Sequence, residues 1–166
     1  MRYREIALLA GLIFAVEASG LDSDRDQPAT LEANDFELDL KTGVRTYRGD
    51  VVYRQGSIRL ECDELVTYFN NDGELDKGVC SGDPGRFKQR PEGSEEDMIG
   101  EARVITMDQL EELVTLKSRA RATQGLNTIT GRLITYNLAT EKVIVKGEAQ
   151  TTTASSESAA AEDSVA

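Results

Sequence analysis

Hydrophobic and polar residues alternate along most of this chain, and the alternation recurs in four related segments. Each segment has an apolar residue, a small residue two positions later, and alternating, mostly apolar positions three, five and seven residues further on. The small residues are Ala33, Cys62, Gly100 and Gly131. Strict alternation is typical of a β-strand with one buried face. Because a step of three residues reverses the parity, each strand must bend or bulge next to its small residue to keep one face inward.

The four segments follow one another at intervals of roughly 30 to 40 residues, a repeat length found in stacked β architectures. Turn signals such as Thr42-Gly43, Gln55-Gly56 and Asn70-Asn71-Asp72-Gly73 separate the strand-like stretches. No stretch in the middle of the chain has the length and periodicity of a helix that could cover a sheet. The apolar faces must then be buried sheet against sheet, which predicts an all-β fold with no substantial helix.

The N-terminal end differs from this middle. Residues 1–18 place Arg2 and Arg4 before an apolar stretch, and Val16-Glu17-Ala18 follows as a small-residue cleavage site. This arrangement predicts a cleaved signal peptide and export to the periplasm. The alternative is a retained membrane anchor, although spanning a bilayer takes about 20 apolar residues and this stretch is shorter.

The C-terminal end has a different composition again. Residues 151–166 consist of Thr, Ser, Ala and acidic residues, with Val165 as the one sizeable apolar side chain. Such a segment cannot bury enough apolar surface to offset its ordering entropy, so we expect a disordered acidic tail. Residues 19–150 remain as one domain with room for a core.

Composition excludes several classes of function. The chain of 166 residues has no histidine, which removes histidine-based acid–base catalysis and most catalytic zinc sites. It has no phosphate-binding glycine loop. Its net charge of −11 would repel a nucleic-acid backbone. Runs of carboxylates such as Glu95-Glu96-Asp97 are typical of solvated loops. We therefore expect no enzyme activity, no cofactor, no metal and no nucleic-acid partner.

The two cysteines and the inward rows each leave two interpretations open. Cys62 and Cys80 flank the Asn70–Gly73 turn, so a hairpin could join them in a disulfide, which would persist in an exported protein. Alternatively, they are small buried fillers. The inward rows could form a closed sandwich core, or two sheets joined along one side with an apolar opening suited to acyl chains. Residue types by themselves favour the closed core.

A series of motifs resembles, in family order, the periplasmic lipopolysaccharide-transport proteins of the LptA/OstA-like family. The series covers nearly everything between residues 24 and 147. The matching motifs are Asp26-Gln27-Pro28 leading into Leu31-Glu32-Ala33, Thr46 through Gly56, Ile58 through Asp63, Gly100-Glu101-Ala102, and Ile129-Thr130-Gly131 with Ile134-Thr135-Tyr136.

The resemblance implies an antiparallel β-jellyroll that is open along one side, like a folded taco. It implies a carrier that binds lipopolysaccharide through its lipid A acyl chains, bridges the inner-membrane and outer-membrane transport components of the same fold, and assembles head to tail. The edge strands for this assembly would lie around residues 29–31 and 143–147. The implied groove lining is Leu31, Phe36, Leu38, Leu40, Ile58, Leu60, Leu65, Phe69, Phe87, Ile105, Met107, Ile129, Ile134, Tyr136 and Leu138.

Two features depart from the simplest form of this reading. Arg103 falls on an inward position of the third segment. A charge at such a position requires either an oppositely charged partner or a place at the mouth of the groove, where it stays in contact with water. Ser118 stands where a glycine is expected. The alternatives are the membrane-anchored sister component of the same pathway, with an uncleaved N-terminus, and a β-sandwich or solenoid enzyme that acts on envelope glycans.

Overall fold

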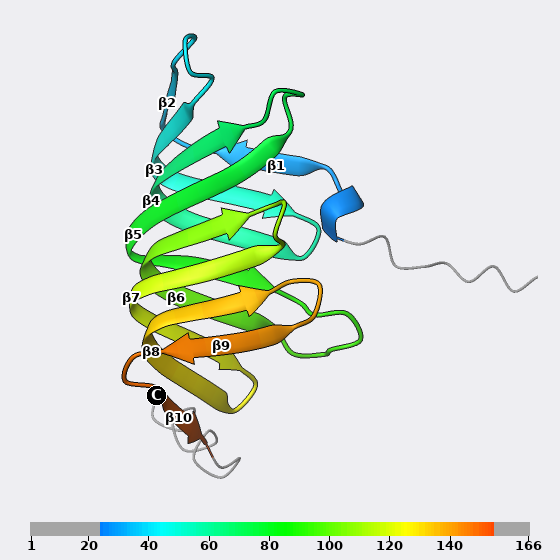
Figure 1. The fold of residues 1–166 in the computed structure, drawn as a ribbon, viewed down its shortest axis with the longest axis vertical. Coiled ribbons are helices and arrows are strands. Elements are labelled where there is room, and N and C mark those ends of the chain that lie inside the picture. The colour runs from blue at the N-terminus through cyan, green and yellow to red at the C-terminus, as the bar shows by residue number, and fades with distance from the viewer. Residues whose placement is uncertain (1–23, 155–166) are drawn as a thin grey trace, which may run out of the picture.

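The structure is a computed structural model that describes residues 24–154 (Figure 1). The predicted signal peptide of residues 1–18 and residues 155–166 of the predicted tail lie outside this range. In the described part of the chain, a short 3-10 helix, η1, precedes ten strands that belong to one antiparallel sheet. The elements are η1 Asp24–Asp26, β1 Ala29–Glu32, β2 Asp35–Leu38, β3 Arg45–Gln55, β4 Ile58–Phe69, β5 Leu75–Gln89, β6 Met98–Asp108, β7 Leu113–Gln124, β8 Asn127–Asn137, β9 Lys142–Lys146 and β10 Gln150–Thr153.

Strands that are neighbours in sequence are mostly neighbours in the sheet. The order is β1-β3-β4-β5-β6-β7-β8-β10, with β2 also beside β3 and β9 also beside β8. Each of the two sheet edges is therefore made of two short strands. β1 and β2 cover the two halves of β3, and β9 and β10 cover the two halves of β8.

A line of bulges folds the sheet into two leaves. The register shifts once near the middle of every long strand pair, at Arg48/Val51, Glu61/Glu64, Ser81/Gly85, Glu101/Val104 and Lys117/Ala120. We call this line the crease. Leaf A holds β2, β9 and residues 45–48, 64–69, 75–81, 104–108, 113–117 and 133–137. Leaf B holds β1, β10 and residues 51–55, 58–62, 85–89, 98–102, 120–124 and 127–131. Figure 1 shows the two leaves as overlapping layers joined along one side.

The crease provides the parity change that the sequence pattern requires. On β7 it uses two consecutive residues in the left-handed region, Ser118 with φ 66° and Arg119 with φ 56°. This region favours glycine, so Ser118 does adopt the backbone conformation for which a glycine was expected. On β3 the same bend uses Gly49 and Asp50, with φ of 78° and 48°.

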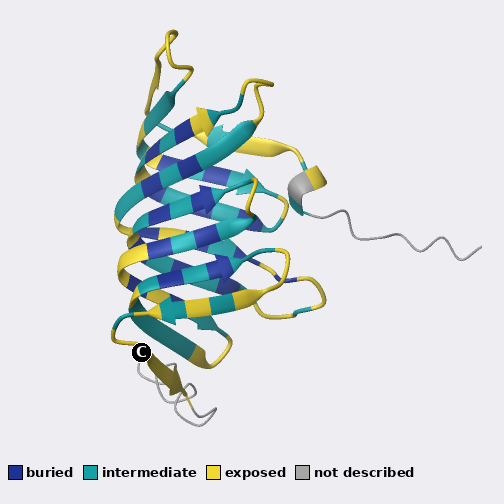
Figure 2. Cartoon of the chain, in the orientation of Figure 1, coloured by how far each residue is buried: buried dark blue, intermediate teal, exposed yellow. Residues whose placement is uncertain are grey.

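Buried residues from both leaves meet in the space between them. Along the long strands buried and less buried residues alternate, and the exposed residues gather at the hairpin ends, along the crease and on the short edge strands (Figure 2). One row of cross-strand partners in leaf A is Leu65, Cys80, Ile105, Leu116 and Ile134, and all five are buried. The Phe87 ring of leaf B lies 6.5 Å from the Tyr136 ring of leaf A, so the two leaves pack directly on each other at this point.

The inward position predicted for Arg103 is wrong. Gly100 pairs with Phe87, which in turn pairs with Leu60, so Gly100 lies in the row of Leu60 and not in that of Cys62. The small residue next to the crease on β6 is Ala102, two positions further along. Arg103 consequently points outward, with 49% of its side chain exposed, and its Nε lies 3.5 Å from a carboxylate oxygen of Asp83.

The predicted start of the disordered tail is also wrong. Thr151 to Thr153 belong to β10, whose backbone pairs with residues 127–130 of β8. Threonine is β-branched and suits an extended edge strand even without an apolar face to bury. The C-terminal edge therefore consists of β9 and β10, and not only of residues 143–147.

The contact between the leaves gives a direct stability test. We expect Phe87→Ala to lower the free energy of unfolding by about 3–5 kcal/mol, because it removes a fully buried ring and leaves a cavity between the leaves. Urea unfolding followed by circular dichroism measures the change. Tyr68→Ala on the outer face, where Tyr68 is 40% exposed, is the control and should cost about 1 kcal/mol or less. If Phe87→Ala lowered the unfolding free energy by only about 1 kcal/mol or less, the packing of the two leaves at Phe87 would not contribute to stability.

Candidate functional site

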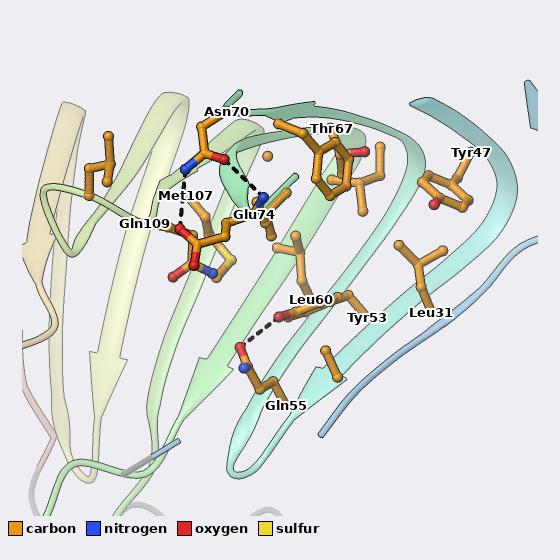
Figure 3. A pocket seen from close by; sticks show the side chains of 16 residues that line it. Leu31, Tyr47, Tyr53, Gln55, Leu60, Thr67, Asn70, Glu74, Met107 and Gln109 are labelled. Atoms are coloured by element: carbon orange, nitrogen blue, oxygen red, sulfur yellow. Dashed lines mark hydrogen bonds between the residues drawn. The ribbon is translucent and has the colours of Figure 1, made fainter. Parts of the chain in front are cut away.

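An apolar cavity of about 480 Å³ lies between the leaves toward the N-terminal end of the sheet. Figure 3 shows side chains from both leaves around this space. Leaf B contributes Leu31, Tyr53 and Leu60, and leaf A contributes among others Leu65 and Met107. Because successive side chains of a strand point to opposite faces, each strand gives every second residue to the cavity and the residues between them to solvent.

Polar side chains line the cavity only where they have partners. The Tyr53 hydroxyl donates a hydrogen bond of 2.7 Å to Gln55 Oε1. Asn70 Nδ2 donates to a Glu74 carboxylate oxygen at 3.2 Å, in the turn between β4 and β5 (Figure 3). These pairs lie at the hairpin ends of the leaves, so the interior of the cavity remains apolar. Such a lining, apolar with a polar rim, has the chemical character of a site for an apolar ligand.

The structure brings most of the predicted groove residues to the inner faces of the leaves. The buried ones are Ile58, Leu60, Leu65, Phe87, Ile105, Met107, Ile134 and Tyr136. The half-buried ones are Leu31, Phe69, Ile129 and Leu138. Of all these, Leu31, Leu60, Leu65, Phe69 and Met107 line the cavity. The rest of the buried set lies between the leaves outside this cavity, and Ile58 among them lines the hollow at the mouth that is described below.

Three predicted groove residues are exposed, for two different reasons. Phe36 and Leu38 pair with Tyr47 and Arg45, so they extend the inner face of leaf A to the edge strand β2. They are 58% and 41% exposed because no further strand covers this edge, and the Phe36 ring lies 5.0 Å from that of Tyr47. Leu40 follows the end of β2 in a turn and is 87% exposed, so its assignment to the lining is wrong.

Several lining residues were missed by reading only the four repeated segments. Tyr47 and Tyr53 of β3 line the cavity, as do Leu75 at the start of β5 and Leu110 in the turn after β6. On β3 the signal was weak, since the apolar residue Val52 separates Val51 from Tyr53 and breaks the alternation. Leu110 carries no such signal because it lies in a turn.

A second, polar hollow of about 740 Å³ lies at the open mouth between the leaves. It is lined by hairpin ends of both leaves and by Asp24 of η1, with acidic residues such as Glu92 and Glu141. The Asp24 carboxylate accepts hydrogen bonds from Ser57 N at 2.6 Å, Ser57 Oγ at 2.7 Å and Gln89 Nε2 at 3.1 Å. The N-terminal end of the described chain is thereby attached to the mouth of leaf B.

The two cysteines lie together at the inside of the crease. Both are buried, with Cys62 on the leaf B side and Cys80 on the leaf A side, and both are free thiols in this structure. The contact with Cys62 and burial raise the pKa of the Cys80 thiol well above its ordinary value. Of the two arrangements left open by the sequence, the structure has the second, in which the cysteines are small buried fillers. A disulfide in the exported protein stays a prediction.

Two further properties of the described residues concern metals and membranes. Within residues 24–154, no group of three or more Cys, Asp or Glu side chains could hold a metal ion. No helix in that same range is long and apolar enough to cross a membrane.

The fold and the cavity define an open antiparallel β-jellyroll with an apolar trough between two leaves. Residues 30–142 match the family described as LptA/(LptD N-terminal domain) LPS transport protein. This chain belongs to that family, as its motifs predicted, and the predicted fold class is confirmed.

Relatives and a solved structure agree with this assignment. The chain is 32% identical over 143 residues to the lipopolysaccharide export system protein LptH of Pseudomonas aeruginosa. The aligned residues cover 84% of this chain and 81% of that protein. It is 30% identical over 139 residues to LptA of Escherichia coli, covering 82% and 72%. The crystal structure of Pseudomonas aeruginosa LptH, the LptA homologous periplasmic component of the lipopolysaccharide transport device, matches with a TM-score of 0.75 and 26% identity. That match covers 81% of this chain and 100% of the LptH chain.

The buried Tyr136 gives a pH-dependent prediction. Burial, with smaller contributions from Glu141 and Asp24, raises the pKa of Tyr136 from 10.0 to about 12. The unfolded chain therefore loses this proton at lower pH than the folded chain, and the stability that the group contributes is lost as the pH rises from about 10 to about 12. We expect Tyr136→Phe to flatten the fall in unfolding free energy over this interval, measured by urea unfolding at several alkaline pH values. An equally steep fall in the variant would contradict the buried position.

Proposed function

We propose that this protein is a periplasmic carrier that binds lipopolysaccharide, holds the lipid A acyl chains in its trough, and passes them from inner-membrane to outer-membrane transport components. The observation that carries the proposal is the continuity of the apolar inner face. It runs from exposed Phe36 and Leu38 at the N-terminal edge, through the cavity, to half-buried Val143 and Val145 at the C-terminal edge. A trough open at both edges suits long chains that move along it.

The energetics favour acyl chains over head-group charges as the source of affinity. Each methylene buried from water contributes about 0.8 kcal/mol, so burial of about ten chain carbons against a lining that includes Leu31, Tyr53 and Met107 would contribute about 8 kcal/mol. The net charge of −11 and the acidic mouth oppose phosphate groups. The phosphates of the ligand would then remain in solvent outside the mouth.

The relatives support the same substrate and compartment. LptA and LptH are named lipopolysaccharide export system proteins, and LptH is described as a periplasmic component. The chain would carry out no reaction itself, and the energy for transport would come from other components of the pathway.

The two edges of the sheet are suited to head-to-tail assembly. On leaf A, β2 presents Asp35 and Glu37 outward, and β9 presents Lys142 and Lys146 outward. If β9 of one copy pairs with β2 of the next, the lysines of β9 lie beside the carboxylates of β2 on the outer face of the sheet. The apolar residues of both strands then lie side by side on the inner face. Pairing of two β2 strands would instead bring carboxylates together. Charge complementarity thus favours one polarity of assembly, and the exposed edges would be covered by it.

The same edges would join the neighbouring transport components. Strand addition to an open edge uses backbone hydrogen bonds, so a partner with the same fold could take the place of a second copy. The inner apolar faces would then continue from one component to the next.

Lipid capture tests the trough assignment. We expect Leu31→Asp to reduce lipopolysaccharide capture by about tenfold, because a carboxylate in the apolar lining must give up water to face an acyl chain. The measurement is the amount of lipid A that co-purifies with the protein from periplasm, determined by mass spectrometry. Thr30→Asp is the matched control, since Thr30 is the preceding residue on β1 and faces the opposite side. Equal lipid capture by both variants would show that the trough is not the binding site.

Charge reversal tests the polarity of assembly. The double variant Asp35→Lys, Glu37→Lys and the double variant Lys142→Glu, Lys146→Glu should each stay monomeric, because like charges then meet at every contact. An equimolar mixture should assemble, since each variant offers the edge that the other needs. Light scattering over a concentration series measures both. Growth of either variant alone to the size reached by the wild type would contradict the proposed pairing.

A further inference from the structure

Within residues 24–154, two buried polar side-chain atoms between the leaves have no hydrogen-bond partner, namely Gln89 Oε1 and the Tyr136 hydroxyl. Gln89 ends β5 in leaf B and is 9% exposed, and Tyr136 lies near the end of β8 in leaf A and is 3% exposed. Both belong to the inward-facing rows of their strands. Buried polar side-chain atoms nearly always have a partner, so two orphans inside one apolar trough call for an explanation.

The orientation of the Gln89 amide follows from its neighbour. Gln89 Nε2 donates to Asp24 Oδ2 at 3.1 Å. Asp24 also accepts from Ser57 N and Ser57 Oγ, as an ionised carboxylate does. Exchange of the amide nitrogen and oxygen would put two acceptors against each other. The Gln89 carbonyl oxygen therefore has to point away from Asp24 as an acceptor without a donor.

The Tyr136 hydroxyl lies in the same part of the trough. The Tyr136 ring packs on Phe87, which precedes Gln89 by two residues on the same face of β5. Asp24, the partner of Gln89, also contributes to the raised pKa of Tyr136. Tyr136 keeps its proton at neutral pH and is a donor as well as an acceptor. The two orphan atoms thus offer one acceptor and one donor next to the mouth.

We propose that Gln89 and Tyr136 form a polar contact point for an acyl chain that carries a hydroxyl group close to its carbonyl end. One such hydroxyl donates to Gln89 Oε1 and accepts from the Tyr136 O–H, which satisfies both orphans at once. A plain hydrocarbon chain satisfies neither. The position next to the polar mouth matches the carbonyl end of a chain whose tail lies deeper between the leaves.

Access to this point requires a small rearrangement. Both orphan atoms have almost no exposed surface, so a ligand has to separate the leaves locally or displace the Asp24–Asp26 turn. The hydrogen bonds of Asp24 to Ser57 and Gln89 connect that turn to the same place. The inference rests on the proposed function, because it assigns a preference to the proposed acyl-chain trough.

Competition between two fatty acids tests the contact point. β-Hydroxymyristic acid and myristic acid are each used to displace a fluorescent fatty-acid probe from the full mature chain. We expect the wild type to bind the hydroxylated acid about tenfold more tightly, the effect of one well-made buried hydrogen-bond pair. Tyr136→Phe and Gln89→Met should each bring the two affinities within about twofold. Tyr68→Phe, on the outer face, should keep the tenfold preference.

Thermal unfolding without ligand gives a second readout. Tyr136→Phe removes an unpaired buried hydroxyl and keeps the ring on Phe87, so its Tm should equal or exceed that of the wild type. A clearly lower Tm would show that the hydroxyl already has a partner and would overturn the inference. Equal affinity of the wild type for both acids would overturn it as well, while leaving the trough in place. Failure of both acids to displace the probe would overturn the proposed acyl-chain function together with it.

Discussion

The structure depends on one geometric constraint, which is that every long strand must present its apolar residues to the same space on both sides of a bend. Side chains of a strand alternate strictly, so a bend without an inserted residue would turn half of the apolar row into solvent. The bulges at the crease supply the needed change of parity in all five long pairs. Because these bulges line up, one sheet becomes two facing leaves with a shared apolar interior.

The same constraint explains why the trough stays open. Hairpin ends with charged and amide side chains form the mouth, and some polar groups near it have partners, such as Gln55 for Tyr53 and Asp24 for the Gln89 amide nitrogen. The sheet cannot close into a barrel, because β1 and β2 at one edge and β9 and β10 at the other do not meet. The apolar face therefore reaches solvent at both edges, at Phe36 and at Val145. In an isolated domain such open edges favour aggregation, whereas in a domain that joins a neighbour of the same fold they provide the contact surface.

Much of the site could be predicted where a strand has only one plausible register. In the second and fourth repeats, Leu65 and Ile134 follow a single small residue and reach the same buried row. In the third repeat Gly100 and Ala102 are both small, and only the pairing of Ala102 with Gly85 selects the second of them. That choice turns Arg103 outward to Asp83. Alternation likewise continued in sequence as far as Leu40, although the strand ends at Leu38.

The sequence by itself determined the all-β class, the alternation that defines the inner faces, the need for a parity change, and the family. These are local properties, since a two-residue period and a turn signal are read within a few residues. The tertiary structure decided the register at the crease, the exposure of the edge strands, and the hydrogen bond between Gln89 and Asp24 near Tyr136. Those features depend on which distant strands lie opposite one another. No local pattern specifies the partner of a strand, and none specifies which polar atoms stay without a hydrogen-bond partner.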